Sequence, residues 1–234
     1  MDIGDKMNDS VNVVFEIPYF NLPVTNVVIM SWIAMIIIIL WAFFATRKMK
    51  EVPSGLQNTA EVVVETVNNF VSGFMGDDGK KFAPYVGTIG LFLVIANTIG
   101  ALFMGELTHG LIAPPARSLG VAVALALMTI ILAIGAGICK KGFVGFLKSL
   151  FQPLPFLFPF NVLELITKPL SLSMRLFGNI LGAYILMELL FASLPWGIPS
   201  VACLYFDLFD GCLQAFVFVL LTVLYVSEEI EEEV

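Results

Sequence analysis

The sequence predicts an all-α integral membrane protein, with five membrane helices and one amphipathic helix on the membrane surface. Of its 234 residues, 59% are hydrophobic and only 13% are charged, whereas about a quarter of the residues in a soluble domain are charged. Several apolar runs reach the ~20 residues that a helix needs to cross a bilayer. Their continuous apolar character distinguishes them from the short alternating strands of a membrane barrel.

Composition also argues against several kinds of function. The net charge of −7 gives no basis for a nucleic acid partner. One histidine and three cysteines without a Cys-x-x-Cys pair do not make a metal site: His109, Cys139, Cys203 and Cys212. The chain also lacks a Gly-rich phosphate loop and a Ser/His/Asp set, so we expect no cofactor and no enzyme chemistry of its own.

The N-terminal segment leads into the first predicted span. Residues 1–24 are polar and mildly acidic, and residues 25–44 are apolar and long enough to cross a bilayer. A signal peptide would have a shorter apolar region and the opposite flanking charges. Because Arg47, Lys48 and Lys50 follow the span, the positive-inside rule places the N-terminus outside.

Three further helices are expected in the next part of the chain. Residues 53–75 alternate valines and phenylalanines with glutamates and asparagines, which predicts an amphipathic helix along the inner membrane surface. A helix packed on another subunit explains this pattern nearly as well. Residues 83–139 then form a helical hairpin with spans at 83–105 and 118–139, and small residues in the second span indicate close helix contact.

Basic residues fix the predicted topology. Eight of the twelve Lys and Arg residues fall on the side assigned as inner: Arg47, Lys48, Lys50, Lys80, Lys81, Lys140, Lys141 and Lys148. The chain is therefore expected in the plasma membrane, or the inner membrane of a cell with two, with its C-terminus in the cytoplasm.

Residues 161–227 form a final pair of helices that are too long for ordinary spans. As helices, 161–193 and 198–227 would run ~45–50 Å, against a hydrocarbon core of ~30 Å. We therefore expect a long antiparallel hairpin that is strongly tilted in the membrane and closed by a Pro- and Gly-containing turn. The acidic tail at 228–234 is expected to keep the helix end in cytoplasmic water.

Arg175 lies near the centre of the apolar stretch 161–190. An arginine at mid-bilayer costs ~3 kcal/mol or more, so it usually faces a bundle interior or a wet cavity and marks an ion path. The alternative is an arginine that reaches the headgroups from a helix end. That alternative fits poorly, because apolar chain flanks Arg175 on its C-terminal side.

The predicted hairpin brings two polar stripes together. If it closes near 194–195, three pairs of residues lie opposite one another: Arg175 and Gln214, Asn179 and Asp210, Gly182 and Asp207. In α-helical geometry the two aspartates and the glutamine share one face of the second helix, and the arginine and asparagine share one face of the first.

Two interpretations of the arginine remain open at this point. It either neutralises an acidic residue in a buried ion pair of little net stabilising value, or it presents a fixed charge to a carboxylate that moves past it. In the second case it favours the ionised form of that carboxylate and blocks a direct leak between two half-channels. The polar groups available to line access paths are Glu164, Tyr184, Glu188, Asp207 and Asp210.

Two motifs in this hairpin resemble the a subunit of the F-type ATP synthase: TKPLSLSMRLFGN at 167–179 and LQAFVFVLLTVLY at 213–225. The segments VPSGLQN at 52–58 and PPARSLGVAVALAL at 114–127 extend the resemblance over nearly the whole chain. It implies the stator of a rotary motor, which supplies two ion half-channels to the c-ring and couples H+ or Na+ flow to rotation and ATP synthesis. The c-ring, the b subunits and the rest of the synthase are the implied partners.

The resemblance also implies roles for individual residues. Arg175 matches the essential arginine that separates the half-channels and releases ions from the ring carboxylate, and Asn179 and Gln214 match its polar neighbours. Where the best-known bacterial pattern has a glutamate and a histidine, this chain has Tyr184 and Asp207. We expect Asp207, together with Asp210, to supply the channel carboxylate that the tyrosine does not provide.

Three points stay open from the sequence. Glu164 is the candidate for the other access path, and Glu188 lines the outer path or lies near the turn. A stand-alone secondary ion transporter is the alternative function, although the chain shows no inverted repeats or paired broken helices. A purely structural membrane subunit would leave Arg175 unexplained. The transported ion is not determined by the sequence.

Overall fold

The computed structural model describes most of the chain. The described residues are 13–17, 22–47, 49–102, 115, 118–151, 156, 158–193 and 205–230. They contain two strands, two short helical segments and six α-helices: β1 (Val13–Ile17), β2 (Leu22–Thr25), α2 (Asn26–Thr46), α3 (Leu56–Met75), η1 (Gly76–Lys81), α4 (Ala83–Leu102), α5 (Leu119–Ser149), α6 (Phe158–Ser193), η4 (Tyr205–Asp210) and α8 (Gly211–Ile230).

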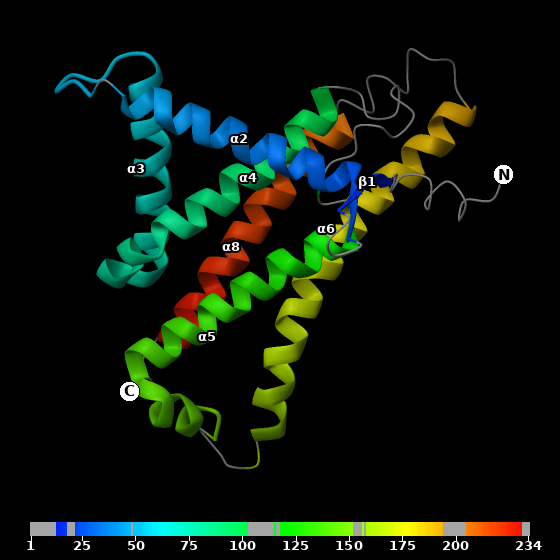
Figure 1. The fold of residues 1–234 in the computed structure, drawn as a ribbon. Coiled ribbons are helices and arrows are strands. Elements are labelled where there is room, and N and C mark those ends of the chain that lie inside the picture. Colours follow the sequence, from blue (N-terminus) through cyan, green and yellow to red (C-terminus); the bar gives the residue numbers. More distant parts are fainter. Residues whose placement is uncertain are drawn as a thin grey trace.

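A short β-hairpin precedes the first helix, in the N-terminal segment for which the sequence predicted neither helix nor strand. β1 and β2 pair antiparallel, and β2 leads directly into α2 (Figure 1). The strand β1 consists largely of β-branched and aromatic residues, which favour extended backbone. The proline of β2, Pro23, is tolerated because a two-stranded sheet consists only of edge strands.

The surface helix and the hairpin that follows are joined at a sharp bend. The segment Leu56–Lys81 meets Ala83–Ile99 at an angle of 118°, and Gly76 at the end of α3 has a φ of 60° that favours glycine. At the other end of α3, the Gln57 side chain donates to the carbonyl of Lys50 at 2.9 Å and accepts from its N–H at 3.0 Å. These bonds hold the preceding loop against α3.

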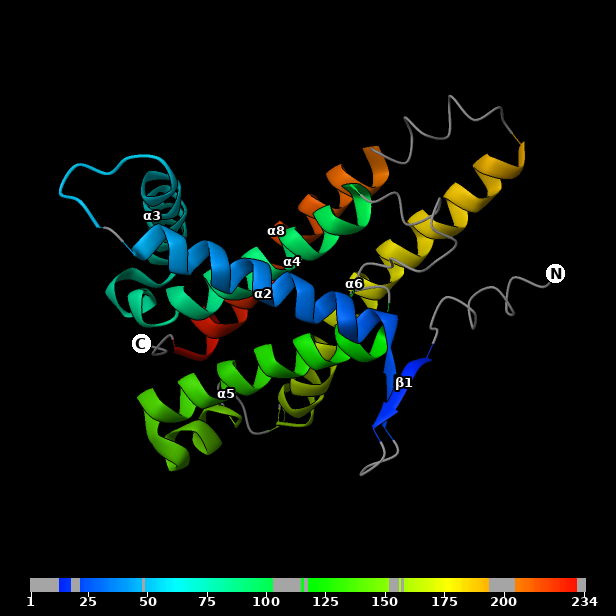
Figure 2. The ribbon, with the colours of Figure 1, turned by 45° about the horizontal axis from the view of Figure 1, so that its top comes forward.

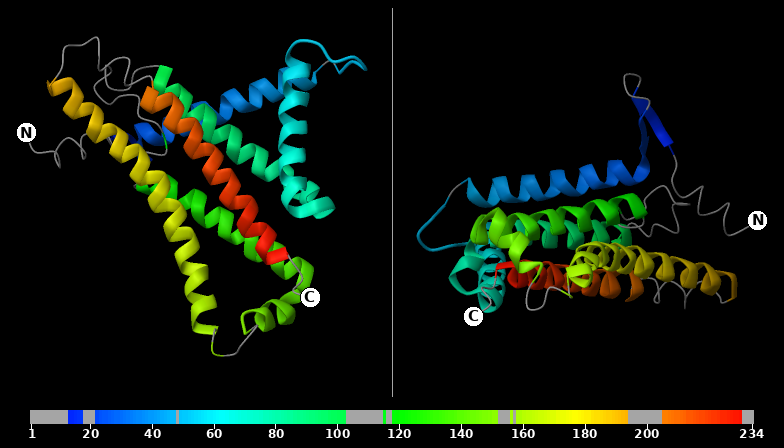
Figure 3. Two further views of the ribbon diagram at one scale, coloured as in Figure 1. Left: turned by 180° about the vertical axis from the view of Figure 1, so that it is seen from behind. Right: turned by 90° about the horizontal axis from the view of Figure 1, so that it is seen from below.

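Two helices of the C-terminal half depart from straight geometry. In α5, Gly142 has φ 75° and ψ 161°, so the helix changes direction there and continues to Ser149 rather than ending at residue 139. In α6, Pro169 lies inside the helix, where it removes one backbone hydrogen bond and produces a kink. Figure 3 shows the resulting bend of α6.

The helices are arranged in layers. Seen from below, α2 lies on one side, α4 and α5 lie in the middle, and α6 and α8 lie on the other side (Figure 3, right). Figure 2 shows α4 running beside α8. The main buried cluster fills the space between the middle layer and the α6–α8 layer, with large side chains at Leu93, Leu125, Leu172, Leu176 and Phe218. Because one side of α6 and α8 packs on this cluster, their other side faces away from the rest of the chain.

Small residues bring α5 and α8 close together, as the sequence predicts. Ala126, Ala133 and Ala136 of α5 are buried, and a Cβ added at Gly137 would lie 3.4 Å from Glu229 of α8. Small side chains let helix backbones approach within a membrane.

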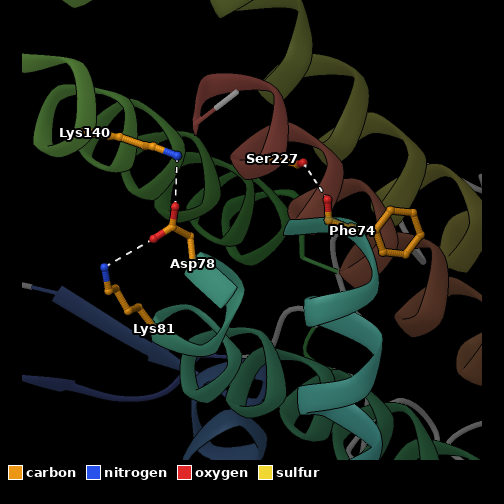
Figure 4. Close-up of polar contacts among 5 residues, drawn as sticks. All are labelled: Phe74, Asp78, Lys81, Lys140 and Ser227. Atoms are coloured by element: carbon orange, nitrogen blue, oxygen red, sulfur yellow. Dashed lines mark hydrogen bonds and ion pairs between the residues drawn. The ribbon is translucent and has the colours of Figure 1, made fainter. Parts of the chain in front are cut away.

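Polar contacts join the elements near the sharp bend. Asp78 of η1 accepts from Lys140 of α5 at 2.9 Å, and the hydroxyl of Ser227 of α8 donates to the carbonyl of Phe74 of α3 at 3.3 Å (Figure 4).

The helical membrane architecture is confirmed, and the number of five spans stays a prediction. Within the described ranges, three helices are long and apolar enough to cross a membrane: Asn26–Thr46, Leu119–Ser149 and Leu208–Ile230. The bent pair of Leu56–Lys81 and Ala83–Ile99 adds a fourth candidate if it forms one broken span.

Candidate functional site

Arg175 lies on the outward side of α6, close to the midpoint of this helix of 36 residues. The side chain is exposed, and it makes no hydrogen bond or ion pair with the residues that the structure describes. It shares its side of α6 with Leu170 and Met174, which are each 54% exposed. Added Cβ atoms at Gly178 and Gly182, on the same side, would meet nothing within 4 Å. The arginine therefore stands on an open, mostly apolar and small-residue surface.

Asn179 connects this surface to α8. Its Nδ2 donates to Oε1 of Gln214 at 2.6 Å, one turn of α6 beyond Arg175. Gln214 is only 3% exposed, and its Nε2 has no hydrogen-bond partner among the described residues. A buried amide that pairs through only one of its two ends keeps one group available for water or another polar partner.

The predicted pairing across the hairpin is wrong by about one helical turn. Asn179 was expected opposite Asp210 and Arg175 opposite Gln214, but the structure pairs Asn179 with Gln214. The predicted register depended on closure of the hairpin near 194–195, and that turn lies outside the described residues. In addition, the prediction assumed α-helical geometry throughout, whereas η4 is a π-helix, whose hydrogen bonds join residues five apart. The wider π turn also removes the premise that the two aspartates and Gln214 share one α-helical face.

A second amide fixes the start of α8. Asn97 of α4 is buried, and its Nδ2 donates to the carbonyl of Gly211 at 3.0 Å. A Cβ added at Gly211 would lie 2.9 Å from the Cβ of Asn97, so the two helices approach closely at the junction of η4 and α8. Gln214 lies one turn further along α8, and its depth therefore depends on this contact.

Charged residues meet near the opposite end of the hairpin. Lys168 of α6 lies 2.8 Å from Oε2 of Glu228 on α8 and 3.3 Å from Oε1 of Glu164, one turn earlier on α6. Glu164, the predicted residue of one access path, is thus held in an ion pair. Glu228 belongs to the predicted solvated tail, and its side chain is exposed as well as paired with Lys168.

The remaining predicted site residues are placed less completely. Asp210 is the last residue of η4 and is half-buried. Tyr184 and Glu188 belong to α6 and Asp207 to η4, and their side chains lie outside the part of the structure that is described. Their roles stay predictions. In the described ranges, no three His, Cys, Asp or Glu residues come together to hold a metal ion.

Sequence reasoning did not assign a role to Asn97 or Lys168. Both carried a detectable signal, because each is a strongly polar residue within or beside an apolar run. Buried polar groups need partners, so each of them predicts a contact with another helix. What the sequence could not supply is which helix lies beside them.

Comparison with known proteins identifies the family of the chain. The family model of the ATP synthase A chain matches residues 28–227. ATP synthase subunit a of Moorella thermoacetica is 37% identical over 206 residues, which cover 88% of this chain and 91% of that protein. The chloroplastic subunit a of Stigeoclonium helveticum is 38% identical over 211 residues, which cover 88% and 85%.

A third relative is the sodium ion specific ATP synthase subunit a of Propionigenium modestum. It is 35% identical over 219 residues, which cover 90% of this chain and 76% of that protein. The matches confirm the family expected from the motifs. The chain belongs to the ATP synthase A chain family.

Proposed function

We propose that the chain is the stator a subunit of a rotary F-type ATP synthase, and that the outward side of α6 and α8 faces the c-ring. The exposed position of Arg175 on a long apolar helix carries this proposal. A permanently charged side chain that faced lipid here would cost ~3 kcal/mol or more. A ring that covers this side and presents carboxylates to it removes that cost.

The surface around Arg175 suits a rotating partner. Gly178 and Gly182 leave space for close approach of another helix, and Met174 and Leu170 provide an apolar contact without fixed hydrogen bonds. A ring helix passing this surface would meet one strong charge and few other polar groups. Its carboxylate would therefore interact with Arg175 in passing, rather than bind permanently to a polar network.

Arg175 would act through its charge. A guanidinium stays protonated at physiological pH, so it favours the ionised form of a ring carboxylate that comes within ~4–6 Å. The carboxylate must then give up its ion on one side of the arginine and take another on the other side. The same charge opposes direct passage of a cation between the two half-channels.

The polar residues of the hairpin would line the two access paths. We assign Asp207 and Asp210, with Tyr184 and Glu188 on α6, to one path, and Glu164 to the other. In this assignment the hydrogen-bonded pair of Asn179 and Gln214 would lie between the first group and Arg175. An Asp207→Asn variant that pumps as well as the native complex would contradict this assignment.

The proposed membrane arrangement has five spans, with the N-terminus outside and the C-terminus in the cytoplasm. The basic clusters at the ends of α2, η1 and α5 would lie on the cytoplasmic side. The partners would be the c-ring, the b subunits and the rest of the synthase. The ion is H+ or Na+, and comparing ATP-driven uptake with and without sodium distinguishes them.

Cysteine cross-linking tests the orientation of α6. In the whole complex, with native cysteines replaced, Met174→Cys should cross-link to a cysteine on the outer helix of the ring. Ile36→Cys on α2 is the matched control, because Ile36 and Met174 are both 54% exposed, and it should not cross-link. Failure of Met174→Cys to cross-link would contradict the proposed orientation. Ion transport by the isolated chain in liposomes would instead support a stand-alone transporter.

A further inference from the structure

Lys168 joins α6 to α8 through a partly buried group of charges. Its ammonium lies between Glu228 of α8 and Glu164 of α6, at 2.8 Å and 3.3 Å, and 5.4 Å from the centre of the Tyr225 ring on α8. The lysine side chain is only 10% exposed, whereas the two glutamate side chains are about half exposed. The contact thus lies in the groove between the helices, with the lysine innermost.

The contact lies at the bend of α6, where it can influence the direction of the helix. Pro169 follows Lys168 directly and interrupts the backbone hydrogen bonds of the helix. Figure 3 shows α6 bending so that its N-terminal part runs away from α8. A helix that lacks a backbone hydrogen bond at a bend has less resistance to further bending. The ion pair with Glu228 spans the two helices at that point.

Arg175 lies seven residues beyond Lys168, or ~10 Å along the helix. Leu172 lies between them and Leu176 lies just beyond Arg175, and both pack into the main buried cluster, while Asn179 pairs with Gln214. The segment that carries Arg175 is therefore attached to α8 on both sides of the arginine. Asn179 makes the contact on one side and Lys168 makes it on the other.

We infer that Lys168 is a positioning residue for Arg175. By binding Glu228, it fixes the direction of α6 across the Pro169 bend and so keeps Arg175 at the depth where the ring carboxylate passes. This inference rests on the proposed function. It differs from a general stabilising role, because it makes the efficiency of coupling depend on the ion pair in complexes that are already assembled.

The test measures ATP-driven ion uptake and ATP hydrolysis in inverted vesicles that contain the whole complex. For Lys168→Gln, the ratio of ions taken up to ATP hydrolysed, per assembled complex, should fall about tenfold, because small misplacements of a reacting group have effects of this order or larger. Lys168→Arg should retain most of the native ratio. Lys80→Gln is the control, since Lys80 pairs only with the exposed Asp77 among the described residues, and its ratio should stay native.

A second variant tests the partner. Glu228→Gln removes the same ion pair by changing the more exposed of its two side chains. This variant can therefore still be measured if Lys168→Gln lowers assembly too far. It should lower the ratio to a similar degree. The double variant Lys168→Gln/Glu228→Gln should be no worse than Lys168→Gln alone, because the Lys168–Glu228 ion pair is already absent in that single variant.

The possible outcomes separate the two claims. A native ratio in assembled Lys168→Gln and Glu228→Gln complexes would overturn the inference and leave a stabilising role only. Losses that multiply in the double variant would overturn it as well, since the two side chains would then act independently. Pumping by an Arg175→Ala variant would contradict the proposed function itself, whatever the Lys168 variants do.

Discussion

Gln214 occupies a buried position between α6 and α8, and its amide is the most direct polar connection between the two helices beside Arg175. Oε1 accepts from Asn179 at 2.6 Å, while Nε2 is without a partner among the described residues. An amide in this state is sensitive to any change in its one contact, because a buried polar group that loses its partner costs free energy.

We expect Asn179→Leu to lower the free energy of unfolding by about 1–3 kcal/mol, because it leaves the buried oxygen of Gln214 without a donor. Unfolding of the purified chain in mixed micelles, titrated with SDS, measures this change. Adding Gln214→Leu should restore most of the stability, since replacing both polar partners by apolar groups is nearly neutral.

The double-mutant cycle of these two positions provides the control. If the two single changes simply add, the Asn179–Gln214 hydrogen bond does not join the helices as described. The double variant should still transport ions poorly, because the proposed function places both residues beside the ion path.

Asp78, outside the membrane spans, has a carboxyl pKa that its ion pairs lower. Its hydrogen bond and charge interaction with Lys140, followed by those with Lys81, hold the pKa of its carboxyl below the ordinary value of 3.8. Since the pKa is lowered on folding, the interaction stabilises the folded chain fully above pH 3.8. This contribution is lost as the pH falls below that value through the folded-state pKa. The carboxylate is exposed, so the stabilisation is modest.

Carbon-13 NMR of the carboxyl groups tests this order of causes. We expect Asp78 to titrate below 3.8 in the native chain, and Lys140→Gln to raise its pKa toward 3.8. Lys81→Gln should raise the pKa of Asp78 by less, because the Lys81 contact is longer, at 3.4 Å against 2.9 Å. A pKa of Asp78 at or above 3.8 in the native chain would rule out the ion pair.

At the scale of elements, the junction of η4 with α8 shows how a small residue sets the position of a helix. Gly211 lies so close to Asn97 that a Cβ at this position would come within 2.9 Å of the Cβ of Asn97. The carbonyl of Gly211 also accepts a hydrogen bond from the same asparagine. Both contacts hold α8 against α4 one turn before Gln214.

We therefore expect Gly211→Ala to lower the free energy of unfolding by about 1–3 kcal/mol, the usual cost of overpacking a filled site. Gly135→Ala on α5 is the control, because its added Cβ would meet nothing within 4 Å. In a helix, alanine is favoured over glycine by ~1 kcal/mol, so this control should be neutral or stabilising. Equal effects of the two variants would contradict the close approach of α4 and α8.

The elements differ in how far the sequence predicts them. Long apolar runs predict helices such as α2 and α5. The alternation of apolar residues with glutamates and asparagines in 53–75 predicts α3. The β-hairpin was missed because its two strands are only five and four residues long and are surrounded by polar residues. The π turn of η4 was missed because hydrophobic periodicity assumes α-helical spacing, and no local residue type marks the wider turn.

The sequence predicted which residues belong to the candidate site, but not which residues of α6 lie opposite which residues of α8. RLFGN and LQAF identify Arg175, Asn179 and Gln214 without a structure. Which of them meet depends on where the hairpin closes and on the helix contacts at Gly211, which arise from packing between helices that are distant in sequence. The same limit explains why the ion pair of Lys168 with Glu228, sixty residues apart, was not foreseen.

At the scale of the whole molecule, the layered arrangement explains why the site is open. The middle layer packs on one side of α6 and α8 (Figure 3), and the other side carries Arg175 beside apolar and small residues. A multi-pass membrane protein of this family cannot leave a charged residue against lipid without cost. The proposed contact with the c-ring would remove this cost by covering that side.

The most direct test of this account is ATP-driven ion uptake into inverted vesicles that contain the whole complex with Arg175→Ala. Assembly should be native, because the arginine makes no hydrogen bond or ion pair with a described residue of its own chain. Uptake should be abolished, because the charge proposed to separate the half-channels is gone. A Lys80→Ala complex in the same assay should pump normally. Uptake that persists in the assembled Arg175→Ala complex would show that the arginine is not the gate and would contradict the proposed mechanism.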